Sequence, residues 1–157
     1  MALIEIITNI NAPIDRCFDL ARNIDFHVVS TSHTGEKAVA GRTSGFIELN
    51  DTVTFSARHL GFRWSLTSRI IEFERPFMFT DQMLKGPFKK LRHEHIFRED
   101  YSRTIMIDRM EMKSPFGFVG KAFDALVLKN YMHKFLLRRC NAVKDCLEST
   151  CWSKYMS

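Results

Sequence analysis

The sequence predicts an α+β protein in which a curved antiparallel sheet of about seven strands wraps around one long C-terminal helix. From Phe116 to about Ser149, apolar residues recur at steps of three and four, as they do on one side of an α-helix. Between Phe46 and Met112, stretches with polar and apolar alternation are separated by short turns, which indicates an antiparallel meander. Two short helical stretches stand between the first strand and this meander.

The first part of the chain supplies a strand and the two short helices. Residues 2–10 are β-branched and partly alternating, which favours a strand. Pro13 suits a first helical turn and predicts a helix to Ala21, and residues 23–30 predict a second short helix or turn. The further strands are expected at 37–40, 52–59, 62–74, 77–84, 88–98 and 103–113.

Length and composition indicate one globular domain. We expect it to span residues 1–149, followed by a loosely ordered tail at 150–157. No apolar run approaches the roughly 18 residues of a membrane span, and Glu5 interrupts any signal-peptide core, so a cytoplasmic protein is expected. The four cysteines form no C-x-x-C pair, which favours reduced thiols over a disulfide framework.

The net charge of +5 is concentrated in the predicted C-terminal helix. Residues 121–144 contain one acid, Asp124, and six basic residues: Lys121, Lys129, Lys134, Arg138, Arg139 and Lys144. Such a helix can approach an anionic membrane or nucleic acid, but the same charges also occur as solubilising groups on an outer helix face. We expect no nucleic-acid partner and, at most, transient membrane contact through this helix.

Several short strings resemble a known superfamily. They are Asn11-Ala12-Pro13 followed by Cys17-Phe18-Asp19-Leu20, then Asp51-Thr52-Val53-Thr54-Phe55, Gly86-Pro87-Phe88 and Arg92-His93-Glu94-His95. Together with the element order over residues 1–149, they resemble the helix-grip fold of START domains, the major birch-pollen allergen and polyketide cyclase/dehydrase proteins (the SRPBCC superfamily), and within it an uncharacterised bacterial subgroup. The resemblance implies a fold; its members include lipid carriers, hormone receptors, cyclases and enzyme subunits.

A cavity is expected because one helix cannot fill a strongly curved seven-stranded sheet. Strand alternation predicts which side chains face it. The expected ligand-binding residues are apolar (Phe55, Trp64, Leu66, Phe79, Met106 and Phe123) and polar (His59, Asp81, His93, His95 and Asp108). Apolar walls with a few convergent polar groups are typical of small-molecule sites.

Three interpretations of the polar residues stay open. They could form a hydrogen-bonded core network, recognise an oxygen of an apolar guest, or act in catalysis, for which His93, His95 and Asp108 are the candidates. The His93-x-His95 pair could also bind a metal with His59 or Asp108 as third ligand, but two-residue spacing is a weak signal. We therefore expect no metal and no cofactor.

The sequence favours a protein that binds or transports a hydrophobic small molecule such as a lipid, a quinone or a polyketide-like compound. The alternative is a cyclase or dehydratase that uses the inner His/Asp group as general acid and base. A second alternative, ranked last, is an interaction protein that presents its basic helix to a membrane or nucleic acid. No feature of the sequence indicates an oligomeric state.

Overall fold

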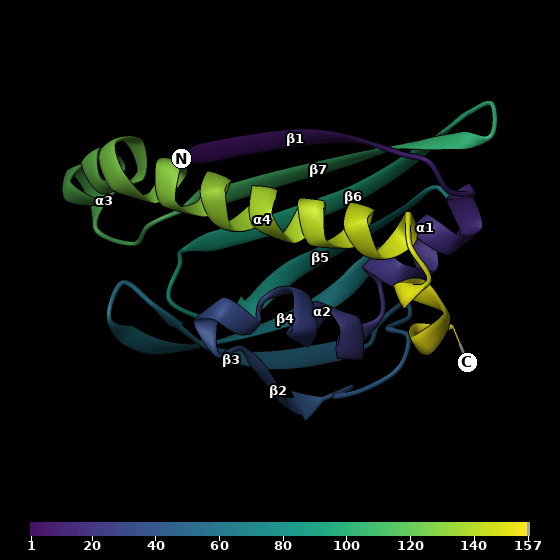
Figure 1. The fold of residues 1–157 in the computed structure, drawn as a ribbon. Coiled ribbons are helices and arrows are strands. Elements are labelled where there is room, and N and C mark those ends of the chain that lie inside the picture. Colours follow the sequence, from purple (N-terminus) through teal and green to yellow (C-terminus); the bar gives the residue numbers. More distant parts are fainter. Residues whose placement is uncertain (157) are drawn as a thin grey trace.

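A computed structural model, which describes residues 1–156, contains one seven-stranded antiparallel sheet (Figure 1). The strand order across the sheet is β1-β7-β6-β5-β4-β3-β2. The chain therefore returns from β7 to pair with β1, while β2 lies at the opposite edge. The strands are β1 (Ala2–Ile10), β2 (Lys37–Gly41), β3 (Thr52–His59), β4 (Phe62–Glu74), β5 (Met78–Lys85), β6 (Lys90–Asp100) and β7 (Arg103–Lys113).

The helices lie on one side of this curved sheet (Figure 1). Two short ones, α1 (Ile14–Ala21) and α2 (Ile24–Ser30), follow β1, and a 3₁₀ turn at Ser32–Thr34 leads into β2. The C-terminal helix is continuous but has three parts: α3 (Gly117–Phe123), a π-helical turn (Asp124–Leu128) and α4 (Lys129–Leu147). This arrangement confirms the predicted α+β helix-grip fold. No helix within residues 1–156 is long and apolar enough to span a membrane.

Local sequence explains why the hairpins form where they do. The β3–β4 turn consists of Leu60 and Gly61, both with positive φ, between the paired residues His59 and Phe62. Positive φ at both central residues is the conformation that two-residue hairpins favour, because its twist matches that of the strands. Strand β1 alternates strictly between buried and exposed residues, so only one face of this edge meets the core.

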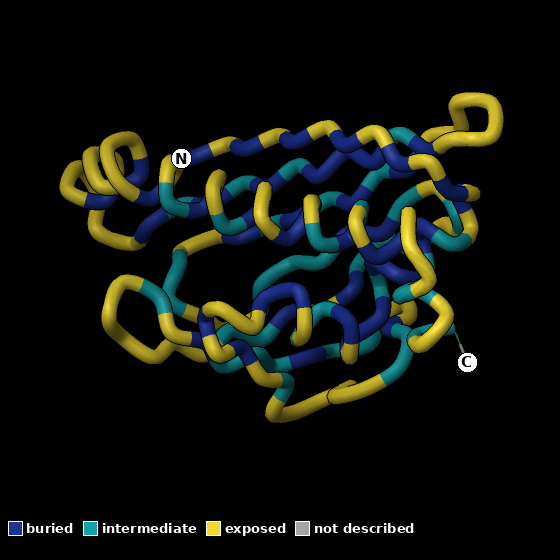
Figure 2. Tube along the Cα trace, viewed as in Figure 1, coloured by how far each residue is buried: buried dark blue, intermediate teal, exposed yellow. Residues whose placement is uncertain are grey.

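The solid part of the core lies where α1 packs against the sheet. The Phe18 side chain is fully buried and meets the rings of Phe73, Phe79 and Phe97 edge-on, at centroid distances of 5.4, 5.4 and 5.5 Å. Edge-to-face contacts of this kind add to the free energy of burial. Helix α1 thus closes one end of the sheet, and buried residues concentrate there and under α4 (Figure 2).

The C-terminal segment differs from its prediction in two ways. It is not loose: a 3₁₀ helix at Cys151–Tyr155 packs Trp152 under the Arg16 guanidinium, and Tyr155 against Phe26. The expectation of reduced thiols is wrong for Cys146 and Cys151, which form a disulfide across the end of α4, whereas Cys17 and Cys140 are free. The chain turns back after Leu147 and brings the two sulfurs together, which spacing alone did not indicate.

Phe18 is expected to be a main determinant of stability. The Phe18→Ala variant should lose about 3–5 kcal/mol of unfolding free energy, because it leaves a cavity among three rings. Phe62→Ala, which truncates an exposed ring, should change it by less than about 0.5 kcal/mol. Urea denaturation of both variants measures the difference, and equal losses would contradict the central role assigned to Phe18.

Candidate functional site

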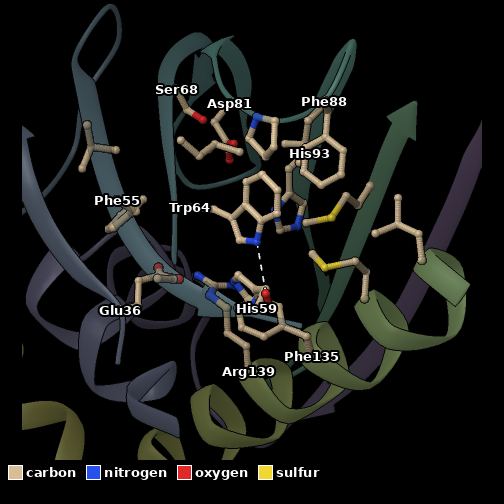
Figure 3. Close-up of a pocket in the computed structure, with 18 of the residues that line it drawn as sticks. Glu36, Phe55, His59, Trp64, Ser68, Asp81, Phe88, His93, Phe135 and Arg139 are labelled. Carbon is tan, nitrogen blue, oxygen red and sulfur yellow. Dashed lines mark hydrogen bonds between the residues drawn. The ribbon is translucent and has the colours of Figure 1, made fainter. Parts of the chain in front are cut away.

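A cavity of about 480 Å³ lies between the concave face of the sheet, α2 and the C-terminal helix (Figure 3). Its walls are mainly apolar and come from β3, β4, β5 and β6 on one side and from α3 and α4 on the other. The volume falls within the range of about 300–1,000 Å³ that is usual for small-molecule pockets. The cavity exists because α4 packs over β1 and leaves the β3–β5 side of the sheet uncovered.

Nine of the eleven residues predicted to bind a ligand line this cavity. They are Phe55, His59, Trp64, Leu66, Phe79, Asp81, His93, His95 and Phe123. The remaining two, Met106 and Asp108, are fully buried behind the wall. Strand alternation placed them on the correct face of β7, but α4 covers that strand and leaves no open space over them. Met110, further along β7, does line the cavity.

The Asp108 carboxylate organises the polar wall of the cavity. It is completely buried, and its Oδ1 lies 2.9 Å from His93 Nε2 and 3.2 Å from His95 Nδ1. Its Oδ2 accepts a hydrogen bond from the Cys140 thiol at 3.3 Å, and Arg139 Nη1 lies 3.8 Å from Oδ1. One carboxylate therefore joins β6, β7 and α4.

His95 stands between two carboxylates. Its Nε2 lies 3.0 Å from Asp81 Oδ2, while its Nδ1 faces Asp108 at ion-pair distance, without the direction of a good hydrogen bond. Ionised carboxylates only accept hydrogen bonds, so both ring nitrogens act as donors when the imidazole is protonated. Of the two carboxylates, Asp81 is the one that lines the cavity, so the Asp81–His95 pair is accessible from it.

The surroundings shift the pKa values of these groups in opposite directions. Burial by itself raises the pKa of Asp108, but the hydrogen bond from His93 and the close approach of the His95 ring outweigh it and hold that pKa well below its usual value. Burial and the neighbouring His95 lower the pKa of His93. Burial also acts to lower the pKa of His95, but Asp108 and Asp81 outweigh it and raise that pKa. The wall thus keeps a proton on His95 in preference to His93.

Asp81, His93 and His95 are also the described residues that could hold a metal ion. One donor atom from each lies within 4.8 Å of the others. Two imidazoles and one carboxylate form a common ligand set, with Asp108 placed behind both rings as an orienting carboxylate. The third ligand would be Asp81 rather than His59, because His59 Nδ1 pairs with the Tyr131 hydroxyl at 2.8 Å elsewhere in the cavity.

A second polar group occupies the wall formed by α2, β2 and α4. Glu36 is buried and paired with His27, whose ring stacks on Phe55 at a centroid distance of 4.4 Å. Burial by itself raises the pKa of Glu36, but its pairing with His27 and the proximity of His59 and Arg139 outweigh it and lower that pKa. Burial lowers the pKa of the neighbouring His59. Strand alternation could not identify Glu36 and His27, because Glu36 stands just before β2 and His27 lies within α2.

Arg139 was assigned to the outer face of the basic helix, and this is wrong. Only 3% of the residue is exposed, its Nη2 donates to the Ala21 carbonyl at 3.1 Å, and it lines the cavity opposite Ser68 and Asp81 (Figure 3). Its Nε and Nη1 have no hydrogen-bond partner among residues 1–156. The position of Arg139 in the sequence indicates this burial, because Met132, Leu136, Arg139 and Val143 follow the three- and four-residue steps of the buried helix face.

The exposed residues of the cavity wall mark its mouth. They come from the β3–β4 turn and from the start of the C-terminal helix, and comprise Leu60, Trp64, Phe116, Val119 and Phe123. The mouth adjoins the β3–β4 turn, and none of residues 41–45 lines the cavity. The Trp64 indole donates to the His59 carbonyl at 3.1 Å and so holds the rim of the β3–β4 hairpin in place (Figure 3).

Comparison by sequence finds no relative: no protein-family model matches the chain, and neither does any curated protein. Comparison by structure finds many. A START superfamily protein from Mycobacterium smegmatis superposes with a TM-score of 0.71 at 8% identity, over 94% of this chain and 98% of that one. Ginseng major latex-like protein 151 from Panax ginseng gives 0.70 at 11% identity, over 94% and 98%.

An aromatase/cyclase is also among the similar structures. Zhui aromatase/cyclase from Streptomyces sp. R1128 superposes with a TM-score of 0.70 at 12% identity, over 93% of both chains. Identities this low show a shared fold alone. The predicted resemblance is confirmed at that level: the chain has the helix-grip fold of the START and latex-like proteins.

The buried Asp108 network should make stability depend on pH. The pKa of Asp108 in the folded protein lies below its unfolded value of about 3.9, so its contribution is present above about pH 4 and is lost as pH falls further. Asp108→Asn should therefore cost about 3–5 kcal/mol at neutral pH, because it leaves two imidazoles without their carboxylate. The difference in unfolding free energy between this variant and wild type should become smaller below about pH 4.

Urea titrations at neutral and acidic pH measure this difference. Asp100→Asn is the matched control, because Asp100 lies on the exposed β6–β7 hairpin and should change stability by less than about 0.5 kcal/mol. A neutral-pH stability of Asp108→Asn equal to that of wild type would show that the network does not stabilise the fold.

Proposed function

We propose that this protein binds a hydrophobic small molecule in the cavity between its sheet and its C-terminal helix. The observation that carries the proposal is the open, apolar space of about 480 Å³, bordered by separate polar groups on two walls. A protein that needed only a stable core would fill such a space with side chains, because close packing is the normal state of protein interiors. The structural likeness to START and latex-like proteins supports the same function.

The walls indicate the shape and polarity of the guest. Phe55, Leu66, Phe79 and Phe123 offer apolar and aromatic contact for its body. Polar side chains gather around Asp81, His93 and His95 and, on the other wall, around Glu36 and Arg139, with the His59–Tyr131 pair elsewhere in the lining. An elongated apolar molecule with an oxygen function at one or both ends fits this distribution, as in a lipid, a quinone or a polyketide-like compound.

Blocking the cavity should abolish binding without unfolding the protein. Ala57 is a small cavity-lining residue on β3, and Ala57→Phe places a ring in the space that the guest would occupy. We expect titration with Nile red, a neutral apolar dye that fluoresces in apolar surroundings, to show saturable binding to wild type. The variant should bind at least about tenfold more weakly, since it loses more than one side chain's worth of buried apolar contact.

Ala40→Phe is the matched control, because Ala40 is exposed on the edge strand β2 and lies outside the cavity lining. It should bind the dye as wild type does. Absence of saturable binding to wild type, or equal binding by both variants, would overturn the proposed function. Native mass spectrometry with organic extraction then identifies any guest carried from the host.

A cyclase or dehydratase is the second candidate, and the position of His95 favours it. His95 can supply a proton through Asp81, which faces the cavity and pairs with its Nε2 at 3.0 Å, to a carbonyl or hydroxyl oxygen of the guest, with His93 beside it as a base. Such a pair could assist enolisation and loss of water.

His95→Ala separates catalysis from binding. If the protein is an enzyme, the variant should still bind the extracted guest but convert it about 10²–10⁴ times more slowly, as expected when a general acid is lost. Product formation followed by mass spectrometry is the measurement. Unchanged turnover in the variant would exclude this role for His95, and Nile red binding shows whether the cavity is intact.

A further inference from the structure

Large apolar side chains gather at the end of the molecule that holds the cavity mouth. Phe62 lies in the β3–β4 hairpin, Leu84 at the end of β5, and Phe116, Phe118 and Leu126 at the start of the C-terminal helix. Their exposed fractions run from 50% for Leu84 to 90% for Phe118. These segments lie at the left end of Figure 1, where Figure 2 shows exposed chain on both the helix and the hairpin.

Four of these five residues take no part in lining the cavity. Phe62, Leu84, Phe118 and Leu126 lie outside its lining, whereas their neighbours Leu60, Trp64, Phe116 and Val119 belong to it. The apolar surface therefore continues from the cavity wall, over the rim, onto the outside of the molecule. Contiguous exposed apolar surface of this kind marks an interaction site more often than a free surface.

The backbone conformation at the cavity rim also indicates an interaction site. Leu60 has a φ of 52°, a left-handed conformation that disfavours a branched side chain and in hairpin turns usually holds Asn, Asp or Gly. A leucine at this position is therefore unfavourable for folding, yet it places an apolar side chain at the tip of the hairpin. Residues kept in such conformations are concentrated at functional sites.

The charge around the mouth is mainly positive: Glu111 pairs with Lys90 at 3.1 Å, and Asp124 is buried. The three segments at this end, 58–63, 84–90 and 113–121, carry no acidic residue and seven basic ones: Arg58, Arg63, Lys85, Lys89, Lys90, Lys113 and Lys121. The opposite end is mixed in charge: the β6–β7 hairpin carries Glu99 and Asp100 beside Arg98 and Arg103, and α1 carries Asp15 beside Arg16. This asymmetry orients the molecule in the field of a negatively charged surface, with its mouth toward that surface.

We infer that this end docks onto an anionic lipid bilayer, with Phe62, Leu84, Phe118 and Leu126 entering the interface and the surrounding lysines meeting acidic headgroups. The inference rests on the proposed function, because docking there would let an apolar guest pass between bilayer and cavity without crossing water. Apolar side chains ringed by cations are the combination that binds such surfaces. A protein partner would be favoured by apolar contact alone, which does not account for the cationic ring.

This surface replaces the one expected from the sequence. The sequence allowed, at most, transient membrane contact through the basic C-terminal helix. In the structure, Arg139 is buried, and the Lys144 ammonium is held by the Glu148 carboxylate and the Asn9 carbonyl. Lys129, Lys134 and Arg138 stay exposed along the helix, but large exposed apolar side chains accompany the cations at the mouth.

Flotation of the purified protein with vesicles tests the inference. The vesicles are phosphatidylcholine alone, or phosphatidylcholine with about 30 mol % phosphatidylserine. Wild type should bind the anionic vesicles, and more weakly as ionic strength is raised. Phe118→Ser/Leu126→Ser should weaken binding by at least about tenfold, through loss of two inserted apolar side chains. Lys85→Gln/Lys89→Gln should weaken it by about fivefold per lysine.

Matched controls carry the same changes away from the mouth. Val39→Ser/Tyr101→Asn removes two exposed apolar side chains, and Arg103→Gln/Lys154→Gln removes two exposed cations. Both should bind vesicles as wild type does. No binding of wild type to anionic vesicles, or equal losses in mouth and control variants, would overturn the inference.

Two further measurements keep the outcomes separate. Nile red binding should be unchanged in Phe118→Ser/Leu126→Ser, since neither residue lines the cavity. If wild type binds the dye but not the vesicles, the proposed function stands and only the docking surface is excluded. Light scattering after size exclusion reports the oligomeric state. A dimer of wild type that the Phe118→Ser/Leu126→Ser change dissociates, with vesicle binding absent, would assign the surface to a second copy of the chain and overturn the inference.

Discussion

The buried carboxylate of Asp108 is the constraint on which the rest of this structure depends. A fully desolvated charge is tolerated only where other groups compensate it, and here His93, His95, Cys140 and Arg139 all approach it. Those partners come from β6 and α4, so the carboxylate fixes how the C-terminal helix lies across the sheet. It also orients both imidazoles, which present the remaining polar surface of this wall to the cavity.

The position of α4 divides the concave face into a filled and a hollow half. The helix packs directly over β1 and β7, so that Met106 and Asp108 are completely buried. At one end α1 inserts Phe18 among three aromatic rings. No element covers β3 to β5 in the same way, so the side chains there line an open space rather than a core. A single helix gripped by a strongly curved sheet produces this division, and the START and latex-like structures share the fold itself.

Chemistry and surface properties follow the same axis. The polar groups that could orient or transform a guest lie inside, on two walls, while the apolar surface and the excess of positive charge lie around the mouth. At the opposite end, acidic and basic residues are mixed. The interior thus favours an apolar molecule with polar ends, and the exterior favours an encounter through the mouth with a negatively charged apolar phase.

The sequence by itself determined the fold, the order of elements and part of the cavity wall, because alternation in strands and three- and four-residue steps in helices are local properties of the chain. Nine of the eleven predicted residues, including His93 and His95, line the cavity for that reason. Tertiary structure decided the rest. Only the path of α4 over the sheet shows that Asp108 lies behind the wall and that Arg139 and Glu36 face inward. Only the return of the chain after Leu147 brings Cys146 to Cys151. These are contacts between segments far apart or oppositely directed, and periodicity within one segment does not encode which neighbour covers it.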